Sequence, residues 1–171
     1  MIRLKTLLTE IDLSSLTPYA TQFIWRDAWG DASNVTSKVM LQGVPVKFTF
    51  NSQGYTGTHY VFGFWMSTAS GTFTTSTTKT SASGQLSYMR LMLTCLEAIR
   101  DFANTHQVNI VDISGADSSA IKGAQKTRIY AELLKANASM FPDFTVTQPN
   151  SEILALVRKS SADSTGIQNA S

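Results

Sequence analysis

The longest pattern of apolar positions lies in the middle of the chain, over residues 86–105. Apolar side chains recur there at the spacing of an α-helix and fill two adjacent stripes of the helical wheel. A helix with so wide an apolar arc has to be covered on most of its sides. Its polar positions form one narrow strip: Ser87, Arg90, Thr94, Glu97 and Asp101. We therefore predict that this helix is the centre of the fold.

Before this helix the pattern changes to alternation, which is typical of β-strands. Strands are expected over three stretches: 35–41, 44–50 and 59–66. Short links between them favour an antiparallel meander. Pro45 cannot donate to a strand ladder, so it belongs at an edge or at the start of a strand. Three aromatic residues upstream alternate in the same way and are expected to begin the meander: Tyr19, Phe23 and Trp25.

After the meander the signals are more mixed. Residues 67–83 are mostly Ser and Thr, and they fit a polar edge strand and an exposed loop equally well. Residues 108–113 are rich in β-branched side chains and predict a strand covered on both faces. A second helix is expected to follow, capped by Ser118 or Ser119 and carrying apolar residues as far as Met140. Two stretches are expected to close the fold as a hairpin: 144–146 and 153–157.

This order of elements predicts an α+β fold, in which an antiparallel meander is followed by helix, strand, helix and a closing β-hairpin, with helices on the faces of the sheet. The length of 171 residues fits a single domain, which we place at residues 12–159. Residues 1–11 are amphipathic and predict either a leader or a short docking helix. The polar tail, residues 160–171, is expected to be disordered.

Composition excludes several functional classes. The net charge is only +2 and the 14 basic residues are scattered, so no specific nucleic-acid site is evident. No apolar run reaches the roughly 18 residues of a membrane span, so we expect a protein made in the cytoplasm that has no membrane partner. The only cysteine, Cys95, lies in the apolar stripe and is expected to be a small core residue. Too few Cys and His residues are present for a four-ligand zinc site, so no metal is expected.

Candidate catalytic residues are few. The spacing of Glu97, Asp112 and Asp117 does not place two carboxylates together. Asp112 is expected to be a strand-end or edge group, and His59 and His106 are expected to be structural or solvated. A small basic cluster near the start of the second helix fits a solvated face better than a phosphate site: Lys122, Lys126 and Arg128.

Residues 79–159 resemble the second half of the GNAT acetyltransferase fold, in which a strand leads through a Gly-rich loop into a helix, a strand, a second helix and a closing hairpin. The segment Ser-Ala-Ser-Gly-Gln-Leu at 81–86 stands where that family has Arg/Gln-x-x-Gly-x-Gly/Ala, and Gly84 alone matches. Leu86 stands where a small residue would let backbone N–H groups reach the pyrophosphate of the cofactor.

For an acetyltransferase, this resemblance implies acetyl-CoA as cofactor and Ser83, Gly84 and Gln85 as its binding residues. Tyr130 lies where the family often has its general-acid tyrosine, although a tyrosine on that helix fits core packing equally well. If the chain neither binds acetyl-CoA nor uses Tyr130 as a general acid, the same resemblance implies a catalytically degenerate GNAT-like fold with no cofactor.

The pattern also resembles a group of bacteriophage proteins, through Ala-Ile-Arg-Asp-Phe at 98–102 and Lys-Thr-Arg-Ile-Tyr at 126–130. It is similar to the N-terminal region of head-packaged ADP-ribosyltransferases of T-even phages. That activity needs Glu-x-Glu, which this sequence lacks. Residues 1–10 resemble the capsid-targeting leader of T-even internal head proteins, with Leu8, Thr9 and Glu10 as the prohead protease site.

Three functions follow as hypotheses. The first is a phage virion or head-associated protein that acts by binding other virion or capsid proteins, without catalysis. The second is an acetyl-CoA-dependent N-acetyltransferase. The third is a phage effector that binds a host partner. An acetyltransferase needs a cleft with a phosphate-sized backbone nest at Gly84, whereas a structural protein has that space filled.

Overall fold

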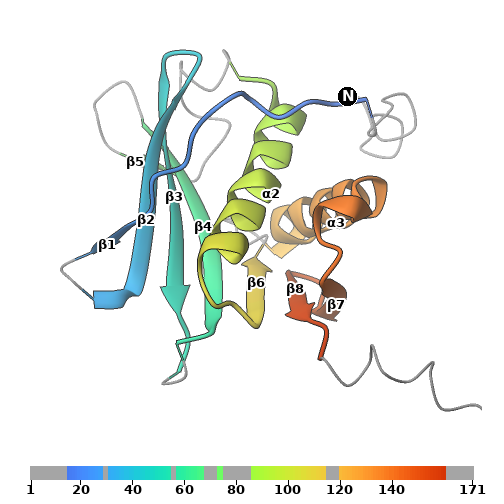
Figure 1. The fold of residues 1–171 in the computed structure, drawn as a ribbon. Helices are drawn as coiled ribbons and strands as arrows, with labels where there is room; N and C mark the ends of the chain where they lie inside the picture. Colours follow the sequence, from blue (N-terminus) through green and yellow to red (C-terminus); the bar gives the residue numbers. More distant parts are fainter. Residues whose placement is uncertain are drawn as a thin grey trace, which may run out of the picture.

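The structure is a computed structural model, and it describes residues 15–28, 31–54, 57–67, 73–74, 86–114 and 120–160. It is a mixed α+β fold with an eight-stranded sheet in the order β1-β2-β3-β4-β6-β8-β7, and β5 pairs with β4 off this path (Figure 1). The strands are β1 (Arg26–Ala28), β2 (Asp31–Leu41), β3 (Val44–Ser52), β4 (His59–Ser67), β5 (Phe73–Thr74), β6 (Ile110–Ser114), β7 (Phe144–Asn150) and β8 (Ile153–Arg158). The helices are α2 (Tyr88–Thr105), α3 (Ala120–Ala136) and a 3₁₀ helix, Ala138–Met140.

The first four strands form the expected antiparallel meander. Gln42 and Gly43 link β2 to β3 with positive φ angles of 48° and 81°, as a tight two-residue hairpin turn requires. This turn sets the register, in which Leu41 pairs with Val44 and Lys38 with Lys47. Pro45 lies at the start of β3, as expected.

The chain then crosses over through α2, so that β6 pairs with β4 in parallel. The closing hairpin is also present, but it pairs through β8 with β6 and leaves β7 at the edge of the sheet. The hairpin is longer than expected, because β7 continues through Pro149 to Asn150. A proline is tolerated there because an edge strand does not need every N–H group.

Helix α2 is the centre of the core, as predicted, although it begins at Tyr88 rather than at residue 86. Met92, Cys95, Leu96, Ile99 and Phe102 have no exposed surface. Phe102 stacks on Phe50 of β3 with ring centroids 3.8 Å apart. The helix is therefore fastened directly to the middle of the sheet.

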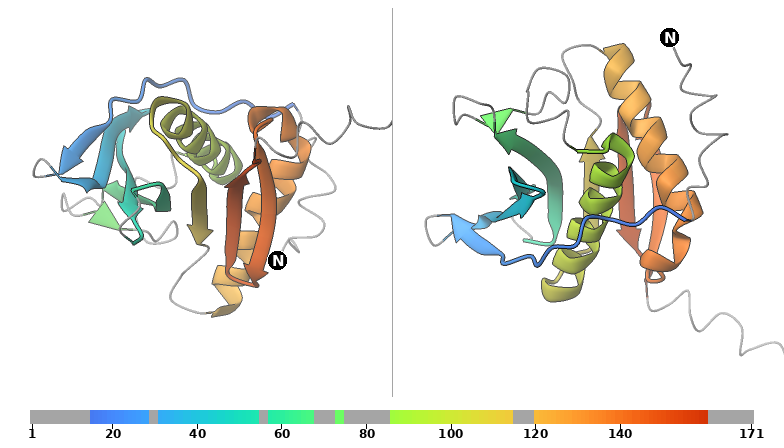
Figure 2. Two further views of the ribbon diagram at one scale, coloured as in Figure 1. Left: turned by 60° about the horizontal axis from the view of Figure 1, so that its bottom comes forward. Right: turned by 90° about the horizontal axis from the view of Figure 1, so that it is seen from above.

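Both helices cover the same face of the sheet, contrary to the expectation of helices on both faces (Figure 2). The buried residues of β6 and β8, such as Val111 and Leu156, are register partners and share the face that Tyr60 presents to Phe102. Helix α3 joins the same core through Tyr130 and Leu133. The prediction that β6 is covered on both faces was therefore wrong, because its other face carries half-exposed side chains.

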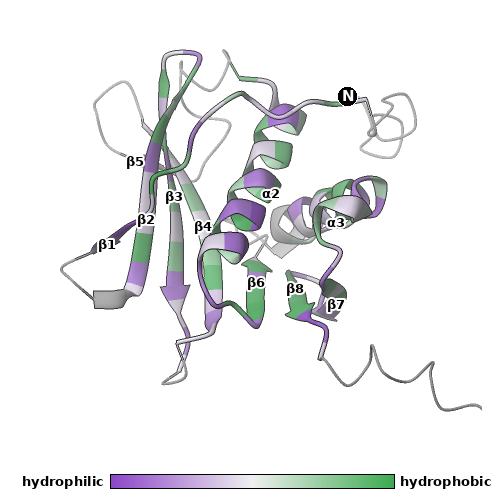
Figure 3. Ribbon diagram, viewed as in Figure 1, coloured by the Kyte–Doolittle hydropathy of each residue, from purple (hydrophilic) through white to green (hydrophobic). Residues whose placement is uncertain are grey.

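The polar strip of α2 is the anchor for the N-terminal segment (residues 15–25). Thr94 accepts a hydrogen bond from the backbone N–H of Tyr19 at 2.9 Å, and Asp101 accepts one from the indole of Trp25 at 2.7 Å. Arg90 donates to the backbone oxygen of Thr17 at 3.0 Å. Figure 3 shows the hydrophilic positions of α2 on the side turned toward the viewer. The strip is thus partly covered by protein, and Thr94 is fully buried.

Several expectations from the sequence differ from the structure or fall outside the described residues. Residues 16–25 form no strand, because the Tyr19 N–H donates to the Thr94 hydroxyl of α2 and the Ile24 N–H donates to the Ser37 hydroxyl of β2, so neither joins a backbone ladder. Helix α3 ends at Ala136, and Met140 belongs to the 3₁₀ helix that follows Asn137. In the stretch 67–83, Phe73–Thr74 forms a short strand, and 68–72 and 75–83 lie outside the described residues. The leader, Ser118, Ser119 and the tail beyond residue 160 also lie outside them.

Candidate functional site

The face of the sheet that points away from α2 and α3, here called the outer face, carries most of the described polar side chains of the strands. Along β3, Val46, Phe48 and Phe50 have no exposed surface and point toward the helices, so the residues between them point outward. Along β4 the outward residues are His59, Val61, Gly63 and Trp65. Two groups of side chains on this face have functional chemistry.

The first group is a His–Asp pair at the junction of β4 and β6. His59 Nε2 lies 2.7 Å from Asp112 Oδ2, and the side chains are 33% and 23% exposed. The parallel register places His59 opposite Ile110, so Asp112 lies diagonally beside it on the same face. Asp112 is thus neither a strand-end nor an edge group, because β6 lies between β4 and β8. This short contact fixes the orientation of the imidazole on the outer face.

The second group, here called the cationic patch, consists of Arg26, Lys38, Lys47 and Trp65. Lys38 is the register partner of Lys47, and Lys47 is the partner of Trp65. Arg26 pairs with Thr36, two residues before Lys38, and so shares their face. The Lys47 ammonium lies 5.6 Å from the centroid of the Trp65 ring. Sequence reasoning missed this patch because its members lie far apart along the chain.

Next to Trp65, neighbouring side chains occupy the space above Gly63. A Cβ atom on Gly63 would lie 3.0 Å from Thr49 Oγ1 and 4.0 Å from Trp65 Nε1. Thr49 donates its hydroxyl to the backbone oxygen of Gly63 at 3.3 Å, and it is buried although it points outward. The residue Trp65 is nevertheless 38% exposed.

Tyr130, the general-acid candidate of the acetyltransferase hypothesis, is 1% exposed and lies against Cys95. Burial, and then the neighbouring Cys95, raise the pKa of Tyr130 well above its usual value. Burial likewise raises the pKa of Cys95 from 9.0 to about 12, opposed by its contact with Tyr130 and by the charge of Lys126. The expectation that Cys95 is a core residue is confirmed.

The start of α2 is filled by Tyr19. The phenol oxygen of Tyr19 accepts a hydrogen bond from the backbone N–H of Ser87 at 2.7 Å, and the Arg90 guanidinium lies 4.1 Å from the centre of the Tyr19 ring. Tyr19 and Leu86 are both buried. Ser83, Gly84 and Gln85, the cofactor-binding candidates, lie outside the described residues, as do the processing candidates Leu8, Thr9 and Glu10.

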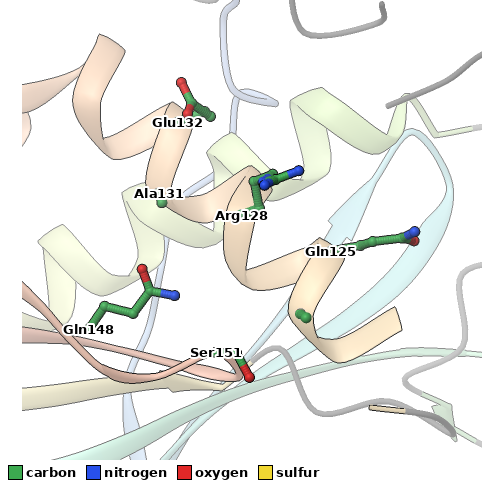
Figure 4. A pocket seen from close by; sticks show the side chains of 7 residues that line it. Gln125, Arg128, Ala131, Glu132, Gln148 and Ser151 are labelled. Carbon is green, nitrogen blue, oxygen red and sulfur yellow. The ribbon is translucent and has the colours of Figure 1, made fainter. Parts of the chain in front are cut away.

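The basic residues of α3 do not act as one solvated cluster. Lys126 is only 9% exposed, because it lies on the turn of α3 that carries Tyr130 inward, whereas Arg128 is exposed. Arg128 lines a shallow depression of about 600 Å³ between α3 and the β7–β8 hairpin (Figure 4). Glu132 from the same helix and Gln148 from the hairpin line it too. The side chain of Lys122 is not among those described.

The remaining candidates are separated. His106 ends α2, where its ring stacks on Phe102 with centroids 4.2 Å apart, so it is structural as expected. Glu97 lies on α2, on the side of the sheet opposite to Asp112, and its partner is Arg100. Asp117 lies outside the described residues.

Among the residues that the structure describes, no three His, Cys, Asp or Glu side chains gather as metal ligands would. None of the described helices is long and apolar enough to span a membrane. A scan against protein-family models gives no match, and neither the curated proteins nor the solved structures contain a protein that matches this chain.

Proposed function

We propose that this protein acts by binding a macromolecular partner on a GNAT-like scaffold, and that it does not transfer acetyl groups. The observation that carries this proposal is the hydrogen bond from the Ser87 N–H to the Tyr19 phenol. A helix N-terminus holds a pyrophosphate through its unpaired N–H groups. Here a buried side chain of the protein occupies the space in front of that helix.

The order of elements supports the scaffold part of the proposal. Parallel strands β4 and β6 are joined through α2, and α3 and an antiparallel hairpin follow, as in the second half of the GNAT fold. Ligands of such sheets bind beyond the carboxyl ends of parallel strands that separate. In this protein β6 leaves β4 after Phe62, and β5 pairs with Met66 and Ser67 further along the strand. Backbone groups of β4 beyond Phe62 are therefore partly paired with β5, at the position where a ligand would need them free.

The position of Tyr130 also disfavours acetyl transfer. A general acid has to come within hydrogen-bond reach of the reacting group. Tyr130 is buried against Cys95, and burial raises its pKa, so the phenol neither reaches a substrate nor releases its proton readily. We assign it a packing role.

We expect calorimetric titration with acetyl-CoA to show no saturable binding, because Tyr19 and Leu86 fill the start of α2. Tyr130→Phe is the matched control, since it removes only the phenol oxygen from the candidate acid. A dissociation constant in the low micromolar range, or an acetyl transfer that Tyr130→Phe abolishes, would refute the proposal.

We also propose that this protein is located in the phage particle. This proposal rests on the resemblance of residues 1–10 and 98–130 to phage proteins. We expect mass spectrometry of purified virions to find this protein with Ile11 as its first residue, because Leu8, Thr9 and Glu10 fit the prohead protease site. Recombinant protein made without the protease is the control and should begin at Met1 or Ile2. Absence from the particle would leave the host-directed effector as the binding hypothesis.

A further inference from the structure

We propose that the cationic patch binds single-stranded nucleic acid, with a base stacked on Trp65 and phosphates held by Arg26, Lys38 and Lys47. This inference rests on the proposed binding function and names the class of partner. It replaces the sequence-based expectation that no nucleic-acid site is evident, because the register of the sheet brings together cations that are scattered along the chain.

The first argument is charge. Lys38 and Lys47 are direct cross-strand partners, and like charges in such positions destabilise a sheet. Among the strand residues whose side chains the structure describes, the charged ones on the outer face of β1 to β3 are Arg26, Lys38 and Lys47, since Asp27 pairs with Val35 on the helix side. A bound polyanion weakens the repulsion between the two lysines. The charge of the cationic patch is therefore complementary to phosphate.

The second argument is the exposed indole. Trp65 is 38% exposed beside a lysine, whereas Trp25 is enclosed by Phe50 and Phe102. Single-stranded nucleic acids bind by stacking bases on aromatic side chains while cations follow the backbone.

The third argument separates this ligand from other anions. An acidic peptide would satisfy the lysines through its carboxylates, but it needs an additional aromatic residue to stack on Trp65, whereas every nucleotide carries both a phosphate and a planar base. A duplex keeps its bases stacked inside, so a flat sheet with an exposed aromatic side chain suits unpaired bases. The patch spans the four neighbouring strands β1 to β4, which matches a few nucleotides and predicts weak, salt-dependent binding.

The test is fluorescence anisotropy with labelled oligo(dT) at several salt concentrations. We expect log K to fall with log salt with a slope of about −2 for three phosphate contacts. Lys38→Gln and Lys47→Gln should each make this slope shallower by about 0.7. Trp65→Ala should weaken binding about tenfold through lost stacking. Lys135→Gln, an exposed lysine at the end of α3, is the matched control and should change neither.

Lys38 is exposed, so its variant should fold, and circular dichroism verifies each protein before titration. Binding that is insensitive to Lys38→Gln and Trp65→Ala would overturn the inference. Equal or tighter binding of poly-glutamate or of anionic vesicles would also overturn it, in favour of an acidic protein or a membrane surface. Loss of this inference leaves the proposed function intact, because only acetyl-CoA binding or turnover in the separate titration refutes that function.

Discussion

Replacing Leu96 with alanine should lower the free energy of unfolding by about 2–5 kcal/mol. Leu96 has no exposed surface and lies in the middle of α2. Close-packed surroundings cannot fully collapse into the space that the leucine leaves, so both the lost transfer energy and the cavity contribute. Equilibrium unfolding in urea, followed by circular dichroism, measures the difference.

Met40→Ala is the matched control for this variant. Met40 lies on the outer face with 62% of its surface exposed, so truncating it should change the free energy of unfolding by less than about 0.5 kcal/mol. Similar small effects for both variants would show that α2 is not the centre of the core.

Alkaline pH should destabilise the protein through Cys95. Burial raises the pKa of the Cys95 thiol from 9.0 to about 12. Between these values the unfolded chain releases the thiol proton and the folded protein keeps it. Stability from this group is therefore fully present below pH 9 and is lost as the pH rises toward 12, by roughly 1.4 kcal/mol for each pH unit.

Urea titrations of the wild type and of Cys95→Ser from neutral pH to alkaline pH isolate this effect. Serine does not ionise in this range and can keep a hydrogen bond to Tyr130, so its variant should lose less stability as the pH rises. Burial, the largest cause of the raised Tyr130 pKa, acts in both proteins, whereas the smaller contribution of Cys95 is absent from the variant. A constant difference in stability between the two proteins above pH 9 would mean that Cys95 is accessible to water in the folded state.

The sequence predicted those elements whose signal is local. The apolar arc of α2 needs only a few helical turns to be recognised, and the strands on either side of Gln42–Gly43 alternate in a short window. The observed ends of helices and strands differ from the expected ones where contacts with a distant segment of the chain determine them. Residues 16–25 alternate like a strand, but Tyr19 and Trp25 donate hydrogen bonds to the polar strip of α2, about 70 positions later in the chain, and the Ile24 N–H donates to a side chain of β2.

The candidate site was less predictable because it depends on register between distant segments. His59 and Asp112 are 53 positions apart and meet only through the parallel pairing of β4 with β6. The Lys38–Lys47 pair could have been found, since a two-residue turn at Gln42–Gly43 fixes which residues face each other. The position of Trp65 opposite Lys47 depends on the longer connection between β3 and β4 and had no local signal.

The most direct test of the central claim is amide chemical-shift mapping on isotope-labelled protein, titrated in parallel with acetyl-CoA and with oligo(dT). The claim is that recognition takes place on the outer face of the sheet and not at the start of α2. We expect oligo(dT) to shift the amide signals of β2, β3 and β4 around Lys38, Lys47 and Trp65, and acetyl-CoA to leave Leu86 to Met92 unchanged. Saturable shifts at the start of α2 with acetyl-CoA, and none on the outer face with oligo(dT), would contradict it.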